Sequence, residues 1–166
     1  MSFAGGGWIL AGNAMRGQGA SKLITVGRIL IAIAAIFFGV EHFLHPAGCP
    51  GVPLEKLTPE WIPGRLLIGY VTGAFLLVAG ASILLARKTR LAATYLGTWI
   101  VLLVLFLYGP ILIVQLSDPS TAVKVEGINY FADTLLFAGA ILALASATPR
   151  TDWPVKASPA ISSGPV

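Results

Sequence analysis

The chain has 166 residues; hydrophobic residues make up 56% of them and charged residues only 11%. A soluble globular domain has roughly 25% charged residues, so the composition excludes both a disordered chain and an ordinary soluble domain. The net charge is +4, and the single cysteine, Cys49, excludes an intrachain disulfide and a CxxC redox pair. Length and composition together predict one domain of an integral membrane protein.

The first 22 residues contain a short apolar run, Gly-Gly-Gly-Trp-Ile-Leu, which Arg16 follows. This run is too short for a secretory signal peptide, so we interpret residues 1–22 as a cytoplasmic N-terminal segment. Met15 is a second candidate for the start of the protein, in which case the residues before it would be a mispredicted extension.

Four apolar runs are long enough for membrane-spanning helices, each of which needs about 20 residues. They cover residues 24–44, 64–86, 91–116 and 127–147. None alternates as a β-barrel strand does, and a backbone without water must form its hydrogen bonds internally. The sequence therefore predicts an all-α fold, a bundle of four transmembrane helices within residues 23–148. The Pro- and Ser-rich residues 149–166 predict a disordered cytoplasmic tail.

The distribution of basic residues predicts the orientation of this bundle. Eight of the eleven lie on one side, near the two termini or in the link between the second and third helices: Arg16, Lys22, Arg28, Arg87, Lys88, Arg90, Arg150 and Lys156. Because basic residues gather on the cytoplasmic side of membrane proteins, we expect both termini in the cytoplasm. The pattern needs no nucleic-acid partner to explain it.

The predicted outer loop between the first two helices, residues 45–63, is rich in proline. Its prolines are Pro46, Pro50, Pro53, Pro59 and Pro63. Because proline fixes φ, the loop is expected to form a stiff external cap. Trp61 near its end fits an interfacial aromatic belt. By contrast, the link at residues 87–90 is so short that the helices it joins must be antiparallel neighbours.

Seven polar residues lie at or inside the outer ends of the predicted helices. A charged side chain in a spanning helix costs about 2.5–3.5 kcal/mol on insertion scales, so each one requires a reason. The seven are Glu41, His42, Arg65, Tyr108, Gln115, Asn129 and Asp133. One interpretation is a polar ligand-binding pocket that opens to the outer side. The other is that they hold the helices together, with Arg65 paired to Asp133 or Glu41.

Asp133 lies about six residues into its predicted helix, roughly 9 Å below the surface at 1.5 Å per residue. Its short side chain should face the bundle and either find a partner or be protonated. Asn129, four residues earlier, shares its helical face. Tyr108 and Gln115 share a face of the third helix, which we expect to be kinked at Pro110.

Two further features have alternative explanations. Glu41, His42 and His45 suggest a metal site, but two histidines on one helix cannot bridge helices, and a histidine at a helix C-terminus has a capping role. We therefore predict no metal site and assign His42 to hydrogen bonding or proton transfer. The small residues Gly69, Gly73 and Gly80 form a stripe that serves close helix packing, either within the bundle or in a homodimer.

The first predicted helix, GRILIAIAAIFFGVEHFLHP, resembles the opening helix of the DoxX family. In that family an arginine begins the helix, a glycine lies near its end, and a short polar cluster and a proline follow. The last helix, NYFADTLLFAGAILALASA, is also similar to the family's last helix. The resemblance covers about residues 27–147, although the long Pro-rich loop departs from the short first loop of that family. The matching residues are Arg28, Gly39, Glu41, His42 and Pro46.

The resemblance implies a small four-helix protein of the bacterial inner membrane. Some members are linked to membrane oxidoreductase complexes, and the related DoxD subunit belongs to a thiosulfate:quinone oxidoreductase. The first hypothesis is therefore a quinone-interacting subunit with a soluble or peripheral redox partner. In it, His42 and Asp133 would contact a bound quinone, and Tyr108 and Phe131 would flank its ring. The second is a non-catalytic scaffold or accessory subunit. The third is a homodimeric small-molecule carrier, with Asp133 as its protonatable group.

Overall fold

The computed structural model describes residues 2–14, 18–51 and 57–149. Met15, Pro53 and the predicted tail from residue 150 onward lie outside the described residues. The elements, in chain order, are α1 (Ser2–Ala14), α2 (Gln18–Leu44), α3 (Arg65–Leu84), α4 (Thr89–Leu103), the π-helical turn η1 (Val104–Tyr108), α5 (Gly109–Leu116) and α6 (Thr121–Ala147). Within the described ranges the fold is all-helical, apart from an isolated bridge between Gly48 and Leu57.

Four helical spans are long and apolar enough to cross a membrane, which confirms the predicted all-helical bundle. They are Gly19–Leu44, Arg65–Leu84, Thr89–Leu116 and Thr121–Ala147. The last span begins at Thr121 rather than at residue 127. The helix starts directly after Pro119 and Ser120, so its first turns are more polar than the apolar run from which its start was predicted. These spans indicate a multi-pass membrane protein in contact with the lipid bilayer.

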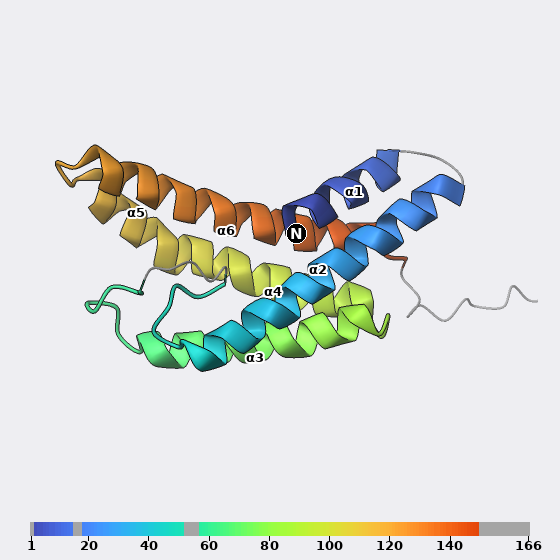
Figure 1. The fold of residues 1–166 in the computed structure, drawn as a ribbon, viewed down its shortest axis with the longest axis horizontal. Coiled ribbons are helices and arrows are strands. Elements are labelled where there is room, and N and C mark those ends of the chain that lie inside the picture. The colour runs from blue at the N-terminus through green and yellow to red at the C-terminus, as the bar shows by residue number, and fades with distance from the viewer. Residues whose placement is uncertain (1, 15–17, 52–56, 150–166) are drawn as a thin grey trace, which may run out of the picture.

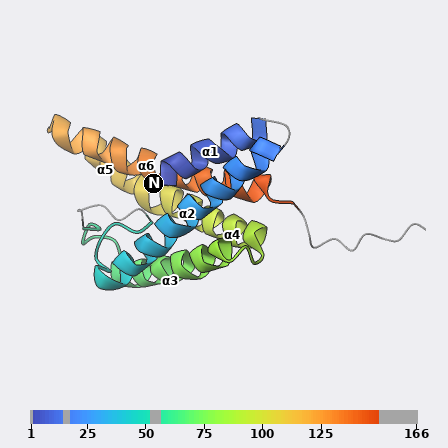
Figure 2. The same ribbon diagram turned by 45° about the vertical axis from the view of Figure 1, so that its right-hand side comes forward.

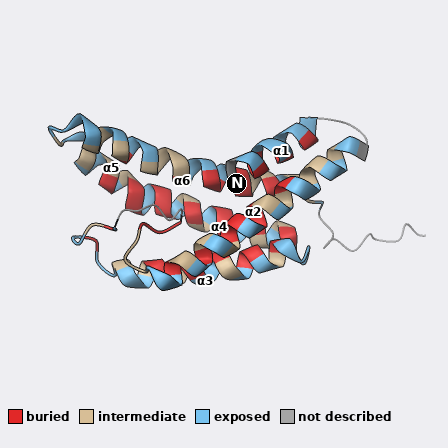
Figure 3. Cartoon of the chain, viewed as in Figure 1, coloured by how far each residue is buried: buried red, intermediate tan, exposed pale blue. Residues whose placement is uncertain are grey.

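The helices form two packed pairs that cross one another. Figure 1 shows α6 along one edge of the bundle, α3 along the opposite edge, and α2 crossing between them; the turned view in Figure 2 agrees. α2 packs on α3, and α4 packs on α6. Fully buried residues such as Leu76, Ile100 and Phe137 fill the centre. Large apolar side chains such as Phe106 and Val78 are exposed, as lipid contact requires. Figure 3 shows exposed positions, in pale blue, along the helices of the bundle.

The small-residue stripe of α3 is used inside the bundle. A Cβ placed on Gly73 would lie 2.9 Å from the Cβ of His42, and one placed on Gly80 would lie 2.9 Å from Cγ1 of Ile36. Such distances are shorter than real side chains allow, so the glycines permit α3 to approach α2 closely. Of the two alternatives left open by the sequence, the structure has the stripe packing within one chain.

The helix α1 was not predicted from the sequence. It runs antiparallel to α2, because Gly5 lies beside Gly27 whereas Gly12 lies beside Ala20 and Ile24. Its side chain Ile9 is fully buried. The contacts with α2 and α6 make this segment part of the bundle rather than a separate extension.

The third span contains a π-helical turn directly before Gly109 and Pro110. The N–H of Gly109 donates to the carbonyl of Val104, five residues back, which is the π-helical pattern. Proline has no N–H to continue the α-helical series, so the irregularity lies where the sequence predicted a kink. Tyr108, at the end of this turn, is only 2% exposed.

Candidate functional site

The first part of the outer loop enters the bundle instead of covering it. We call residues 45–51 the inserted loop. Cys49, Pro50 and Gly51 are all buried. A Cβ placed on Gly51 would lie 3.5 Å from Cδ1 of Ile100 on α4 and 3.5 Å from Cγ2 of Thr134 on α6. The sequence predicted a stiff cap over the bundle; the structure places the beginning of that segment between two spans.

His42 anchors the inserted loop through both of its ring nitrogens. Its Nδ1 lies 2.6 Å from the carbonyl oxygen of Phe38, and its Nε2 lies 2.8 Å from the backbone N–H of Gly51. A carbonyl can only accept, so Nδ1 carries the proton, and Nε2 accepts from Gly51. The imidazole is thus assigned as the neutral Nδ1–H tautomer, with both polar atoms engaged. The predicted hydrogen-bonding role of His42 therefore has a backbone partner.

Tyr108 is the second anchor of the inserted loop. Its hydroxyl donates to the carbonyl oxygen of Pro50 over 2.6 Å, and the contact is buried. The carbonyl of Pro50 and the N–H of Gly51 belong to the same peptide group, so Tyr108 and His42 bind both polar atoms of that group from two different spans. This buried peptide group is satisfied in this way, as insertion into an apolar bundle requires.

The rest of the loop is tied to its inserted part by Thr58 and Arg65. Thr58 donates from its backbone N–H to the carbonyl of Ala47 over 2.8 Å and from its hydroxyl to the carbonyl of Gly48 over 2.9 Å. Arg65 donates from Nη1 to the carbonyl of Thr58 over 3.2 Å. These contacts make the described parts of the loop one hydrogen-bonded unit.

The ion pair expected for Arg65 is different from the one observed. Nη2 of Arg65 lies 3.1 Å from Oε1 of Glu60, in the loop, rather than beside Asp133 or Glu41. As the first residue of α3, Arg65 reaches back over the preceding turn instead of across the bundle. The Glu60 side chain is 89% exposed, so the pair is worth only about 0–1 kcal/mol.

The remaining predicted site residues are spread over the half of the bundle near the Pro-rich loop. Asn129 is exposed, and Glu41 and Asp133 are partly buried. Gln115 lies close to Tyr108: both line a cavity of about 10 Å³, together with Cys49 and others. Such a volume admits at most about one water molecule. Oε1 of Gln115 is buried and accepts no hydrogen bond from the described residues.

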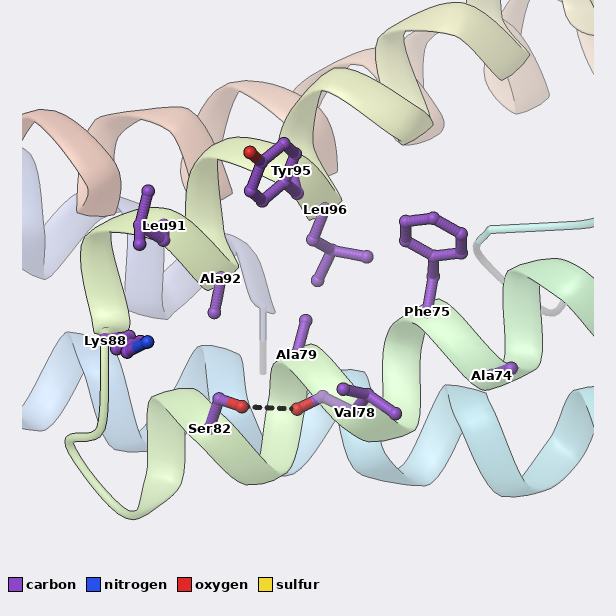
Figure 4. A pocket seen from close by; sticks show the side chains of 10 residues that line it. All are labelled: Ala74, Phe75, Val78, Ala79, Ser82, Lys88, Leu91, Ala92, Tyr95 and Leu96. Carbon is purple, nitrogen blue, oxygen red and sulfur yellow. Dashed lines mark hydrogen bonds between the residues drawn. The ribbon is translucent and has the colours of Figure 1, made fainter.

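The largest hollows that we describe lie on the lateral side, along the seam between α3 and α4. One, of about 650 Å³, lies between residues 74–82 of α3 and residues 88–96 at the start of α4; we call it the link-side groove. Figure 4 shows Phe75 and Ala79 of α3 and Ala92 and Leu96 of α4 pointing into the space between the helices, with Lys88 where the link joins them. A second groove, of about 440 Å³, lies in the other half of the seam, beside Trp99 and Phe106.

An aromatic stack separates the two grooves. The rings of Phe75 and Trp99 are stacked with centroids 5.0 Å apart and an angle of 8° between their planes. Nε1 of Trp99 also donates to Oγ1 of Thr72 over 3.1 Å, which fixes the indole between α3 and α4. Both volumes lie within the range of roughly 300–1,000 Å³ that is typical of small-molecule sites.

Sequence reasoning singled out His42 and Tyr108 as members of a ligand pocket and missed the backbone partners that the structure gives them. Gly51 and Thr58 were not identified, although Pro50–Gly51 is a turn signal and Gly51 has φ +106°. Among the residues that the structure describes, no three His, Cys, Asp or Glu side chains form a group that could hold a metal ion. Comparison of the chain with protein-family models, curated proteins and solved structures finds no match in any of the three.

Proposed function

We propose that this protein is a non-catalytic accessory subunit, or scaffold, of a membrane complex, and that its outer loop docks a partner protein. The observation that carries the proposal is the use made of the polar residues at the loop end of the bundle. His42 and Tyr108 bind the inserted loop, and Arg65 binds its continuation. These side chains thus build a rigid outer surface.

That surface carries large apolar side chains. Leu57 is 63% exposed and Trp61 is 56% exposed, although both belong to a loop tied down by Thr58 and Arg65. Exposed aromatic and aliphatic side chains on a rigid frame are typical of protein-binding surfaces, where tryptophan is often a hot spot. Because the loop is already held in place, docking of a partner would cost little of the loop's conformational entropy, which favours binding.

We further propose that the chain is a DoxX-like protein of the bacterial inner membrane with both termini in the cytoplasm. Two residues of the resemblance have structural roles that fit a shared fold. Nη1 of Arg28 donates to the carbonyl of Ile83 over 3.1 Å, at the end of α3. A Cβ on Gly39 would lie 2.7 Å from Cγ of Leu77. Both residues therefore join α2 to α3. These two residues of the resemblance thus have a structural role, which supports the scaffold proposal.

A quinone-interacting subunit of an oxidoreductase is the second candidate. It is favoured by the groove of about 440 Å³, where Trp99 and Phe106 would flank an aromatic ring. Asp133, on α6, does not line this groove, so in this version the aromatic side chains bind the ring and a soluble or peripheral partner would carry the electrons. Quinone would then bind in this groove and not beside the inserted loop.

Site-specific photocrosslinking tests the scaffold proposal. A photoreactive amino acid replaces Trp61 in the full chain, produced in cells at native level, and the matched control replaces Leu67, which is 66% exposed on α3. We expect a discrete protein adduct at residue 61 and only lipid adducts at residue 67. Lipid adducts alone at both positions would overturn the docking surface and leave Trp61 as an interfacial anchor.

Organic extraction of the nanodisc-embedded protein tests the second candidate. Near-stoichiometric quinone per protomer in the wild type, lost in Phe106→Ala, which alters the lining of the groove, would support a quinone-interacting subunit. Quinone at the level of the bulk lipid in both proteins would argue against it and favour the scaffold.

A further inference from the structure

We infer that the link-side groove between α3 and α4 binds one anionic phospholipid, with an acyl chain along the helices and the phosphate beside Lys88. The groove has a volume of about 650 Å³ and is almost entirely apolar. Small side chains at Ala79 and Ala92 leave its floor open, whereas Phe75 and Leu96 form its far end (Figure 4). An alkyl chain fits such a surface, since it offers and requires no hydrogen bonds.

The length of the groove matches one leaflet of a bilayer. On α3 it extends from Ala74 to Ser82, and the helix ends at Leu84. From Ala74 to the end of the helix at Leu84, ten steps of 1.5 Å give about 15 Å, which is half of the roughly 30 Å hydrocarbon core. The stack of Phe75 on Trp99 closes the groove at that depth. A lipid of a single leaflet would therefore fill it.

The charge at the open end favours an anionic headgroup. Lys88 lies in the link between the spans Arg65–Leu84 and Thr89–Leu116, which is the level of the lipid phosphates. Its exposed side chain lines the groove. Arg90, in the first turn of α4, is already used, since its Nη1 donates to the carbonyl of Thr148 over 3.2 Å. This end is also the one that the positive-inside pattern predicts to be cytoplasmic, where anionic lipids gather.

A helix of a second copy is a poorer occupant of the same groove. Close helix packing in membranes uses small-residue stripes, and in the stripe of α3 Gly73 and Gly80 face α2 and Gly69 faces Pro46 of the inserted loop, instead of the groove. The groove side of α3 carries Phe75 and Val78, which are 39% and 70% exposed. Bulky exposed side chains of this kind suit contact with lipid chains.

Native mass spectrometry of the full chain tests this assignment. The protein is released from nanodiscs of phosphatidylcholine in which a minority of the lipid is phosphatidylglycerol, and the lipids retained per protomer are counted. We expect one phosphatidylglycerol retained above its bulk share. Lys88→Gln should reduce that retention about fivefold, the effect of roughly 1 kcal/mol for one basic residue near the surface. Arg87→Gln is the matched control, because Arg87 is exposed in the same link but does not line the groove.

A second pair of variants tests the chain-binding part of the groove. Ala92→Leu fills the groove and should abolish retention, whereas Ala81→Leu, at an exposed position of α3 outside the groove, should not. Circular dichroism confirms that each variant is folded, and Lys88→Gln, at an exposed link position, keeps the test open if Ala92→Leu does not fold. Equal retention in Lys88→Gln and Arg87→Gln, or retention of both lipids in their bulk ratio, overturns the proposal. A dimer mass lost in Ala92→Leu would assign the groove to a second copy.

Discussion

The hydroxyl of Tyr108 and the carbonyl oxygen of Pro50 are 2.6 Å apart, although the two residues are separated by 58 positions in the chain. This hydrogen bond joins the third membrane span to the inserted loop at a buried position. Cys49, the neighbour of Pro50, is 4% exposed and is the single cysteine of the protein. The reaction of its thiol with a maleimide therefore reports on whether the loop stays inserted.

Tyr108→Phe removes the donor and leaves the carbonyl of Pro50 buried without its partner. An unmade buried hydrogen bond costs about 1–3 kcal/mol, so we expect a lower unfolding midpoint and labelling of Cys49 about tenfold faster. Tyr95→Phe is the control, because Tyr95 is 67% exposed. Unchanged labelling in Tyr108→Phe would show that the loop is held mainly by other contacts.

His42→Ala removes both contacts of the imidazole, the one to Phe38 and the one to Gly51. We expect Cys49 to become more reactive by at least as much as in Tyr108→Phe, because the N–H of Gly51 loses its acceptor. The same labelling assay measures this effect. His45→Ala is the matched control at an exposed position three residues later. If the two alanine variants label at the same rate, His42 does not anchor the loop.

Gly51→Ala tests the backbone conformation of the inserted loop. Gly51 has φ +106°, a region that side chains rarely adopt, yet the nearest atoms to an added Cβ are 3.5 Å away. The expected destabilisation of about 1–3 kcal/mol therefore comes from the backbone and not from a steric clash. Thermal unfolding in detergent measures it. Gly139→Ala serves as the comparison, because a Cβ at Gly139 meets no atom within 4 Å and α6 should tolerate it.

Ile9→Ala tests whether α1 is part of the bundle. Ile9 is fully buried, so truncation of its side chain should cost about 2–5 kcal/mol of stability. Leu10→Ala, at a neighbour that is 61% exposed, should cost much less. Both are compared by unfolding in a denaturing detergent. Equal midpoints would mean that α1 contributes little to the stability of the folded protein, as expected if the protein begins at Met15.

The four spans were predictable because length and apolar composition alone determine them. In lipid, a single apolar segment can form all of its backbone hydrogen bonds only as a helix. α1 was not, because Gly5, Gly6 and Gly12 lower helix propensity. The same glycines allow the close contacts with α2 and α6 that stabilise the helix. That compensation depends on tertiary packing, which a local pattern does not contain.

The candidate site was predictable in residue type but not in arrangement. His42 and Tyr108 are unusual in apolar helices, so they were noticed, whereas their partners are backbone groups of Phe38, Pro50 and Gly51. Every residue carries a carbonyl, and nothing in the sequence marks which one will accept. For Arg65 the sequence suggested a carboxylate across the bundle, but a nearer one, Glu60, was available in its own loop.

The inserted loop also has a consequence for the order in which the protein is assembled. Apart from His42, the residues that surround its buried end, Ile100, Tyr108 and Thr134, come later in the chain than the loop itself. During synthesis α2 and α3 can enter the membrane as a hairpin, but residues 45–51 have no site to occupy until α4 and α6 have followed. Their burial is thus one of the last steps of biogenesis. Until that step the thiol of Cys49 is not yet buried and is accessible to chemical modification.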